Sequence, residues 1–217
     1  MRPNPLIERT IAFVKKTLEH AEGGHDWFHT ERVFKMAEVL AKEEHVDIQV
    51  VQLAALLHDI ADSKFHNGDE EIGPRKAFEF LRSQKLQEST IQHVVHIIRF
   101  MSYKNSLDRE APFFSSMELQ VVQDADRLDA MGAIGIARAF NYGGHKNRAL
   151  YNPDIPPDLN LTKEAYKKSK APTINHFYEK LLLLENQMNT KAAQKKAEAR
   201  HQFMLQFLDQ FYKEWNP

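Results

Sequence analysis

The feature that most constrains this chain is an apolar run that ends in two adjacent polar residues. From Val50 to Leu57 every residue except Gln52 is apolar, so a helix through the run is apolar on nearly every side. Such a helix belongs at the centre of a bundle. His58 and Asp59 follow at once, and burying them is costly without a strong partner such as a cation. The run predicts a central helix over about Asp47 to Ala61, with a metal site at its end.

Helical periodicity recurs along most of the chain. Glycine is scarce, at 8 residues, and alternating strand patterns are hard to find, so the fold is predicted to be an all-α bundle. The other expected helices are Pro5 to Ala21, a helix after the N-cap Asp26, Arg75 to Lys85, Thr90 to Tyr103, Ser116 to Tyr142, Asn175 to Met188 and Lys191 to Trp215, with Ser89 and Thr190 as N-caps. A proline-containing excursion is expected from Gly143 to Thr173.

Composition places the chain among ordinary folded proteins. Its 217 residues suit one domain over 1–217, with a helical extension from about residue 173. The formal net charge of -1 offers no overall field for nucleic acid, so sequence-specific nucleic-acid binding is not expected. The chain has no cysteine, no signal-peptide pattern and no run of 18 apolar residues. We therefore expect a cytoplasmic protein with no membrane partner, whose metal chemistry uses His, Asp and Glu.

Residues on two further helices can complete the predicted metal site. His29 shares an apolar stripe with Val33, Ala37 and Leu40, so it lies on or beside a buried face. A later apolar stretch is followed by Asp124, Asp126 and Asp129, any of which has a plain reading as a capping or ion-pairing residue. Two imidazoles with two carboxylates suit a borderline or hard divalent ion. Four such ligands leave room for water only in five- or six-coordinate geometry.

In their order along the chain, these residues resemble the signature of the HD-domain phosphohydrolase superfamily. That signature is a histidine, then a His-Asp pair, then a later aspartate, all on helices. The segments from His25 to His29, Leu57 to Asp62 and Asp124 to Ala130, and the segment from His176 to Leu181, are similar to its small stand-alone bacterial branch, sometimes called YedJ-like or YpgQ-like. The resemblance covers nearly the whole chain and selects Asp126 among the three aspartates.

The resemblance implies a metal-dependent phosphohydrolase. His29, His58, Asp59 and Asp126 would hold one divalent metal, Mn²⁺ or Mg²⁺ ahead of Fe, Ni or Zn. The implied substrates are nucleoside triphosphates, cleaved to monophosphate and pyrophosphate. Such a cation lowers the pKa of bound water and neutralises charge on phosphoryl oxygens.

Seven further residues are candidates for the chemistry. Asp62 would orient or deprotonate water, and Arg32 and Lys64 would hold phosphate charge. Candidate substrate-binding residues are Lys180, His25, His93 and His96. Each has a structural alternative: Asp62 is a surface carboxylate, the cations are solvated charges, His25 belongs to a helix cap, and His93 and His96 simply pack.

Other functions remain open at this stage. The same metal residues would serve a phosphomonoesterase or a cyclic phosphodiesterase acting on small phosphoesters, and a non-catalytic nucleotide-binding protein would use the metal only to stabilise its fold. The expected partner is a small nucleotide or phosphoester. Phe203, Phe207 and Phe211 form a stripe that is expected to pack in the core or between helices, and this stripe leaves a homodimer open.

Overall fold

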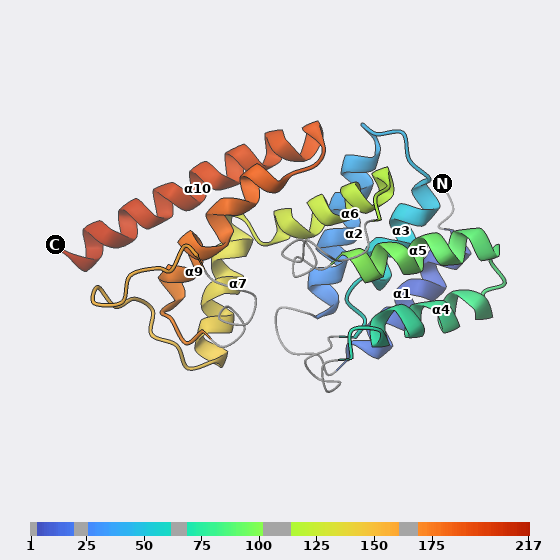
Figure 1. Cartoon of the computed structure of the whole chain (residues 1–217), viewed down its shortest axis with the longest axis horizontal. Coiled ribbons are helices and arrows are strands. Elements are labelled where there is room, and N and C mark those ends of the chain that lie inside the picture. Colours follow the sequence, from blue (N-terminus) through green and yellow to red (C-terminus); the bar gives the residue numbers. More distant parts are fainter. Residues whose placement is uncertain (1–3, 20–25, 62–68, 102–113, 161–168) are drawn as a thin grey trace. The chain divides into compact units, whose positions relative to one another are not determined.

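The computed structural model of this protein describes residues 4–19, 26–61, 69–101, 114–160 and 169–217. Its helices are α1 Pro5–Thr17, α2 Trp27–Ala41, α3 Ile48–Leu57, α4 Ile72–Ser83, α5 Glu88–Phe100, α6 Met117–Asp129, α7 Gly132–His145, α9 Thr173–Glu179, the 3-10 helix η3 Leu181–Gln187 and α10 Lys191–Trp215. The described residues contain helices and no strand (Figure 1), which confirms the all-α prediction.

The chain divides into two compact units, Met1–Ala125 and Asp126–Pro217. The division falls inside α6, which is one unbroken helix. The expectation of a single domain with a C-terminal extension from about residue 173 stays a prediction.

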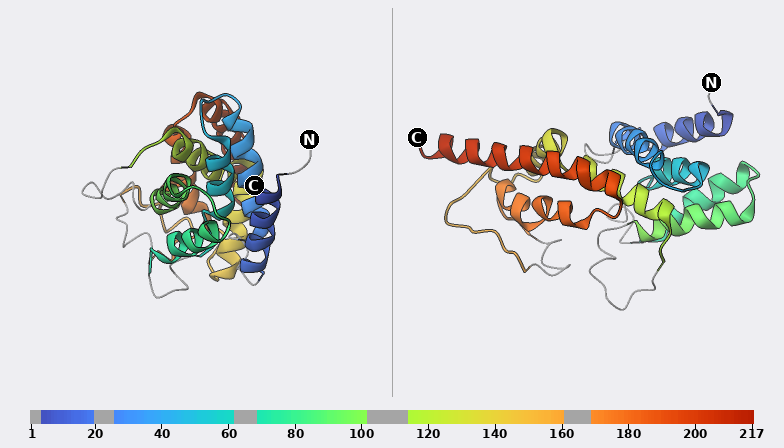
Figure 2. Two further views of the ribbon diagram at one scale, coloured as in Figure 1. Left: turned by 90° about the vertical axis from the view of Figure 1, so that its right-hand side faces the viewer. Right: turned by 90° about the horizontal axis from the view of Figure 1, so that it is seen from above.

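Helix α3 is the centre of the first unit, as its apolar run predicts. It packs against α1, α2 and α5, and α4 packs along α5 (Figures 1 and 2). Seven of its ten residues are buried. Burying each leucine or valine stabilises the fold by about 1.5–3 kcal/mol. The helix ends at Leu57 rather than at Ala61, so His58 and Asp59 stand directly after it.

Side-chain caps explain where several helices begin. Asn4 accepts a hydrogen bond from the N–H of Leu6 at 3.0 Å, and Thr190 accepts one from that of Ala193 at 3.3 Å. Each bond satisfies one of the N–H groups that a helix start leaves without an intrahelical partner. The cap at Thr190 was predicted. The predicted cap at Ser89 is wrong, because α5 begins at Glu88 and Ser89 lies in its first turn.

A break separates α6 from α7, where the sequence predicted one helix from Ser116 to Tyr142. Gly132 has φ +67°, a left-handed conformation that residues with a Cβ adopt at a cost of about 1–2 kcal/mol. Three residues on, a Cβ at Gly135 would lie 2.2 Å from the carbonyl oxygen of Ala130. Both glycines are needed for the tight turn. Because the apolar spacing continues across the turn without interruption, the sequence predicted one continuous helix.

A second break replaces the helix expected from Asn175 to Met188. Lys180, with φ -146° and ψ -56°, ends α9 and precedes η3. Helix α10 then runs over the residues predicted for it and packs against α7 and η3 (Figure 2). On α10, the ring of Phe207 stacks on Phe177 with centroids 5.8 Å apart, whereas Phe203 is 48% exposed. The aromatic stripe is thus only partly buried.

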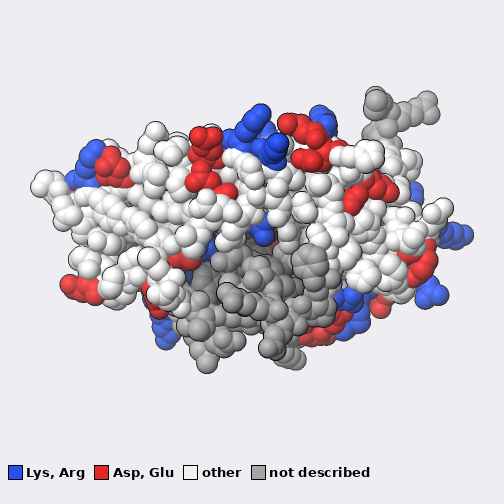
Figure 3. Space-filling view, turned by 45° about the horizontal axis from the view of Figure 1, so that its top comes forward, with Lys and Arg blue, Asp and Glu red and all other residues white. Residues whose placement is uncertain are grey.

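The surface mixes charges of both signs. On the face drawn in Figure 3, Lys and Arg side chains alternate with Asp and Glu side chains over the described residues. Within the described ranges, the helices include none with the length and apolar character that crossing a bilayer requires.

Candidate metal centre

His29 comes from the first turn of α2 and points into the core. The Asp26 carboxylate caps this helix by accepting a hydrogen bond from the His29 N–H at 2.9 Å. His29 lies on the same face as Val33 and Ala37, which are fully buried, and is itself only 1% exposed. The cap determines the residue at which α2 begins, and this sets the direction in which the His29 side chain points.

His58 follows α3 as its C-cap and is half-buried. Its Nδ1 lies 2.9 Å from the carbonyl oxygen of Ala55. A carbonyl only accepts hydrogen bonds, so Nδ1 carries the proton and Nε2 keeps the lone pair that a metal ligand needs. Hydrogen bonds of this kind, from the second ring nitrogen to a backbone carbonyl, are what orient the histidine ligands of metal sites.

The structure brings His58 together with His29 and Asp126. One ligand atom from each of the three lies within 4.8 Å of the other two, and the two imidazole centroids are 5.4 Å apart. Asp126 lies in the last turn of α6. These three residues form a group that can hold a metal ion.

Asp59 stands beside this group. Its Oδ2 lies 3.9 Å from His29 Nε2, and its side chain is 18% exposed. Ligand atoms that share one ion, each roughly 2.0–2.2 Å from it, lie at most about 4.4 Å apart. The spacing of the His29 and Asp59 atoms therefore fits two ligands of one ion, and the donor set of imidazole nitrogen and carboxylate oxygen suits a divalent metal. The assignment of all four residues as ligands stays a prediction.

Three of the predicted catalytic and substrate-binding residues, Asp62, Lys64 and His25, lie outside the described residues. Arg32 is described: it is half-buried on α2, one helical turn beyond His29. Its phosphate-binding role stays a prediction.

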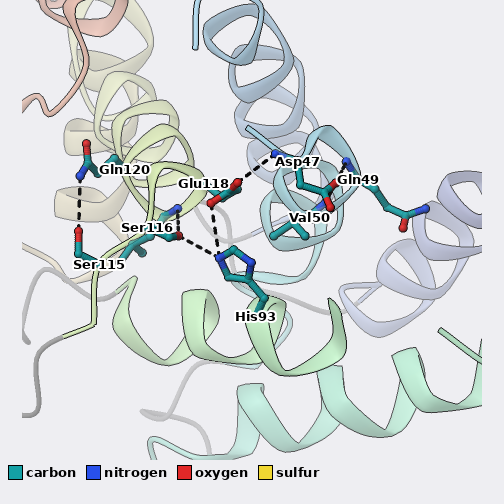
Figure 4. A network of polar contacts seen from close by, with 9 residues as sticks. Asp47, Gln49, Val50, His93, Ser115, Ser116, Glu118 and Gln120 are labelled. Atoms are coloured by element: carbon teal, nitrogen blue, oxygen red, sulfur yellow. Dashed lines mark hydrogen bonds and ion pairs between the residues drawn. The ribbon is translucent and has the colours of Figure 1, made fainter. Parts of the chain in front are cut away.

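His93 and His96 lie on α5 in contact with other side chains. His93 Nε2 is 3.0 Å from Ser116 Oγ and 3.5 Å from Glu118 Oε2. The other carboxylate oxygen of Glu118, Oε1, accepts a hydrogen bond from the Asp47 N–H (Figure 4). Burial raises the pKa of Glu118, but hydrogen bonds and the nearby His93 hold that pKa below its usual value. The His93 network thus joins α5 to the starts of α3 and α6. His96 packs against the ring of Phe114, with centroids 5.4 Å apart.

Lys180 belongs to a cationic cluster in the second unit. Desolvation, together with the positive charges of Lys180 and Arg148, lowers the pKa of His176 to about 3. His176 is therefore neutral at physiological pH, beside two cations. In the sequence, His176 is only the first residue of a segment similar to the family, and a role was predicted for Lys180 alone.

The residues after Asp126 are held by a set of arginine contacts that the sequence did not reveal. Arg127 Nη1 donates to the carbonyl oxygen of Gln187 at 2.5 Å, and Arg138 pairs with Asp129 at 2.5 Å. Arg200, on α10, donates to the carbonyl oxygen of Leu128. A signal for Arg200 did exist, because it interrupts the buried stripe made by Ala193, Ala197, Met204 and Leu208.

Comparisons with known proteins show which family the chain belongs to. The family profile described as HD domain matches residues 27–131. YpgQ of Bacillus subtilis is 36% identical over 216 residues, 99% of this chain and 96% of that protein. A crystal structure of an HD-superfamily hydrolase from Bacillus thuringiensis is similar at 47% identity and a TM-score of 0.76, covering 97% of this chain and 96% of that one. Bacillus subtilis YpgQ in complex with ADP is similar at 34% identity and a TM-score of 0.76, covering 96% and 94%.

Proposed function

The chain belongs to the HD superfamily of hydrolases, and from this premise we propose that it is a metal-dependent phosphohydrolase that cleaves nucleoside triphosphates to monophosphate and pyrophosphate. The observation that carries the proposal is the convergence of His29, His58 and Asp126, with Asp59 alongside. Cytoplasmic location and a homodimer are parts of the proposal that the sequence suggests.

Four residues would hold the metal: His29, His58, Asp59 and Asp126. Six-coordinate geometry then leaves two positions for water and substrate oxygen, which favours Mn²⁺ or Mg²⁺ over a closed tetrahedral zinc site. When bound, the metal would lower the pKa of a water molecule and neutralise charge on the phosphoryl oxygens. Asp59, 3.9 Å from His29, would also offset the charge of the ion.

Other residues would handle the substrate and the attacking water. Arg32 and Lys64 would hold phosphate oxygens that the metal does not reach, and Asp62 would orient the water or take its proton. Lys180, with Arg148 near it, would supply further positive charge for the triphosphate. His25, His93 and His96 complete the proposed substrate-binding set, although the contacts of His93 with Ser116 and Glu118 also give it a role in joining helices.

Nucleotides are favoured as the substrate class by a similar protein. Bacillus subtilis YpgQ, 34% identical over nearly the whole chain, has been crystallised with ADP. A nucleoside diphosphate carries the same phosphoanhydride and base features as a triphosphate. We take the ADP complex as support for nucleotide binding by this chain. It does not bear on which bond of the nucleotide is cleaved.

Product analysis tests the proposal. Chelator-treated protein is incubated with a panel of nucleoside triphosphates, with Mn²⁺, with Mg²⁺ or without metal, and the products are separated by anion chromatography. Monophosphate and pyrophosphate formed only with metal are the expected result. Diphosphate and orthophosphate would instead indicate cleavage of the terminal phosphoanhydride bond, and orthophosphate released from nucleoside monophosphates would indicate a phosphomonoesterase. If no triphosphate is cleaved with either metal, small phosphoesters and cyclic nucleotides become the next substrates to test, and nucleotide binding without turnover would indicate a non-catalytic protein.

A further inference from the structure

The C-terminal helix α10 reaches the end of α6 through one arginine. Arg200 donates a hydrogen bond from Nη1 to the carbonyl oxygen of Leu128, two residues after Asp126. We propose that Arg200 is a positioning residue for Asp126, so that α10 helps to set the affinity of the metal centre. This inference rests on the proposed metal-binding role of Asp126.

The hydrogen bond falls where α6 most needs a donor. The last carbonyls of a helix have no N–H four residues further on, and the helix dipole makes this end negative. The Leu128 carbonyl accepts one hydrogen bond from the N–H of Met131 at 3.1 Å and a second from the Arg200 guanidinium. The second bond is charge-assisted, and bonds of that kind are roughly twice as strong as neutral ones.

The aliphatic part of Arg200 packs on the turn that follows α6. A Cβ built on Gly132 would lie 3.1 Å from Arg200 Cγ and 3.3 Å from its Cβ, so the arginine stem lies against the backbone of this turn. The turn already needs glycine because φ at Gly132 is +67°. Arg200 thus contacts both the Leu128 carbonyl in the last turn of α6 and the backbone that redirects the chain into α7.

Charge and burial restrict the guanidinium further. Burial lowers the pKa of Arg200, and the nearby Asp129 carboxylate opposes that change. Asp129 is 5% exposed and is held in turn by Arg138 on α7. Arg127 is bonded to the carbonyl oxygen of Gln187 in η3. The three residues that follow Asp126 are therefore each tied to a different element of the second unit.

Asp126 itself lies in the final turn of α6, so a displacement of this turn moves its carboxylate. Metal coordination tolerates ligand displacements of only about 0.2 Å. Loss of groups that orient metal ligands typically weakens metal binding by about 10- to 100-fold. Arg200 acts through the backbone of the Asp126 turn, so we expect an effect at the lower end of this range.

Metal titration of the full chain tests the proposal without any substrate. Mn²⁺ is titrated into chelator-treated protein by calorimetry, and the unfolding free energy of the metal-free protein is measured in urea. Arg200→Met keeps much of the stem and removes the guanidinium, and it is expected to weaken Mn²⁺ binding on the order of 10-fold. Arg200→Lys, which retains a charged donor, should bind more tightly than Arg200→Met. Lys195→Met, at an exposed position of the same helix, should bind as the wild type does.

The variant Asp126→Asn distinguishes failure of the proposed metal site from failure of the proposed role of Arg200. If Asp126→Asn loses Mn²⁺ binding while folded Arg200→Met binds with wild-type affinity, the positioning role is overturned, and a lower unfolding free energy alone would show that Arg200 only stabilises the fold. If Asp126→Asn binds Mn²⁺ as the wild type does, the proposed metal site itself fails. Should Arg200→Met not fold, Arg200→Gln, which has a shorter and uncharged side chain, takes its place: weakened Mn²⁺ binding supports the role of Arg200, and unchanged binding overturns it.

Discussion

Among single residues, His58 has both a structural role, at the end of α3, and a proposed chemical role, as a metal ligand. Its Nδ1–H bonds the carbonyl of Ala55, which satisfies part of the end of α3 and orients the ring. The same bond leaves the Nε2 lone pair available to a cation. The end of an apolar helix thus supplies the backbone carbonyl that orients this histidine.

Removing His58 or Asp59 should abolish most of the proposed activity. His58→Ala and Asp59→Ala each delete one proposed ligand. Loss of a residue that only hydrogen-bonds to a metal ligand lowers activity by up to about 100-fold, so loss of a ligand should lower metal-dependent turnover by at least that factor. The measurement is the rate of pyrophosphate release at saturating Mn²⁺. His45→Ala is the matched control, since His45 is exposed and lies outside the proposed site. Full activity of the double variant His58→Ala/Asp59→Ala would refute the assignment.

His176 gives the protein a pH-dependent stability that does not involve the proposed metal. Its pKa is lowered to about 3 by desolvation and by Lys180 and Arg148, whereas an unfolded histidine titrates near 6.5. Above pH 6.5 the ring is neutral in both states. As the pH falls from 6.5 toward 3, the unfolded chain takes up a proton that the folded chain does not, so the unfolding free energy falls by up to about 1.4 kcal/mol per pH unit.

Replacing His176 should flatten this dependence. In His176→Gln the unfolding free energy, measured in urea at pH 7, 6, 5 and 4, should fall less with acidification than in the wild type. His45→Gln serves as the control at an exposed position. Parallel curves for the wild type and His176→Gln would show that the ring of His176 does not resist protonation in the folded chain.

At the scale of elements, the helices that contact the core were the most predictable. Helix α3 follows from its apolar run, the start of α2 from the cap at Asp26, and α10 from its buried stripe with Thr190 as its cap. The two breaks at Gly132 and Lys180 were missed, because apolar spacing continues across both. The Gly132 turn depends on a left-handed φ and on close backbone packing at Gly135, which periodicity does not encode.

The Gly132 turn can be tested against a second glycine of the same helix. Gly132→Ala should lower the unfolding free energy by about 1–2 kcal/mol, because φ is +67° and the new Cβ meets the Arg200 stem at 3.1 Å. Gly144→Ala meets no atom within 4 Å and should instead be neutral or stabilise by up to about 1 kcal/mol. Urea denaturation of both variants gives the comparison. Equal effects at the two positions would contradict the account of the turn.

At the scale of the whole molecule, the grouping of His29, His58 and Asp126 could be predicted because these residue types stand in a family order. Spacing alone left Asp124, Asp126 and Asp129 equivalent, and the resemblance selected Asp126, the aspartate that the structure groups with His29 and His58. Arg200 interrupts the buried stripe of α10, but this pattern does not say which residue it contacts. Its hydrogen bond to the carbonyl oxygen of Leu128 is visible only in the folded chain.

The central claim is that one metal is held by His29, His58, Asp59 and Asp126. Anomalous diffraction from crystals grown with Mn²⁺ tests it most directly, because the signal locates the ion without reference to activity. The account predicts one Mn²⁺ peak per chain, at roughly 2.0–2.3 Å from a ligand atom of each of the four residues. A peak bound by other residues, or full-strength Mn²⁺ density that persists in the Asp126→Asn protein at an unchanged position, would contradict it.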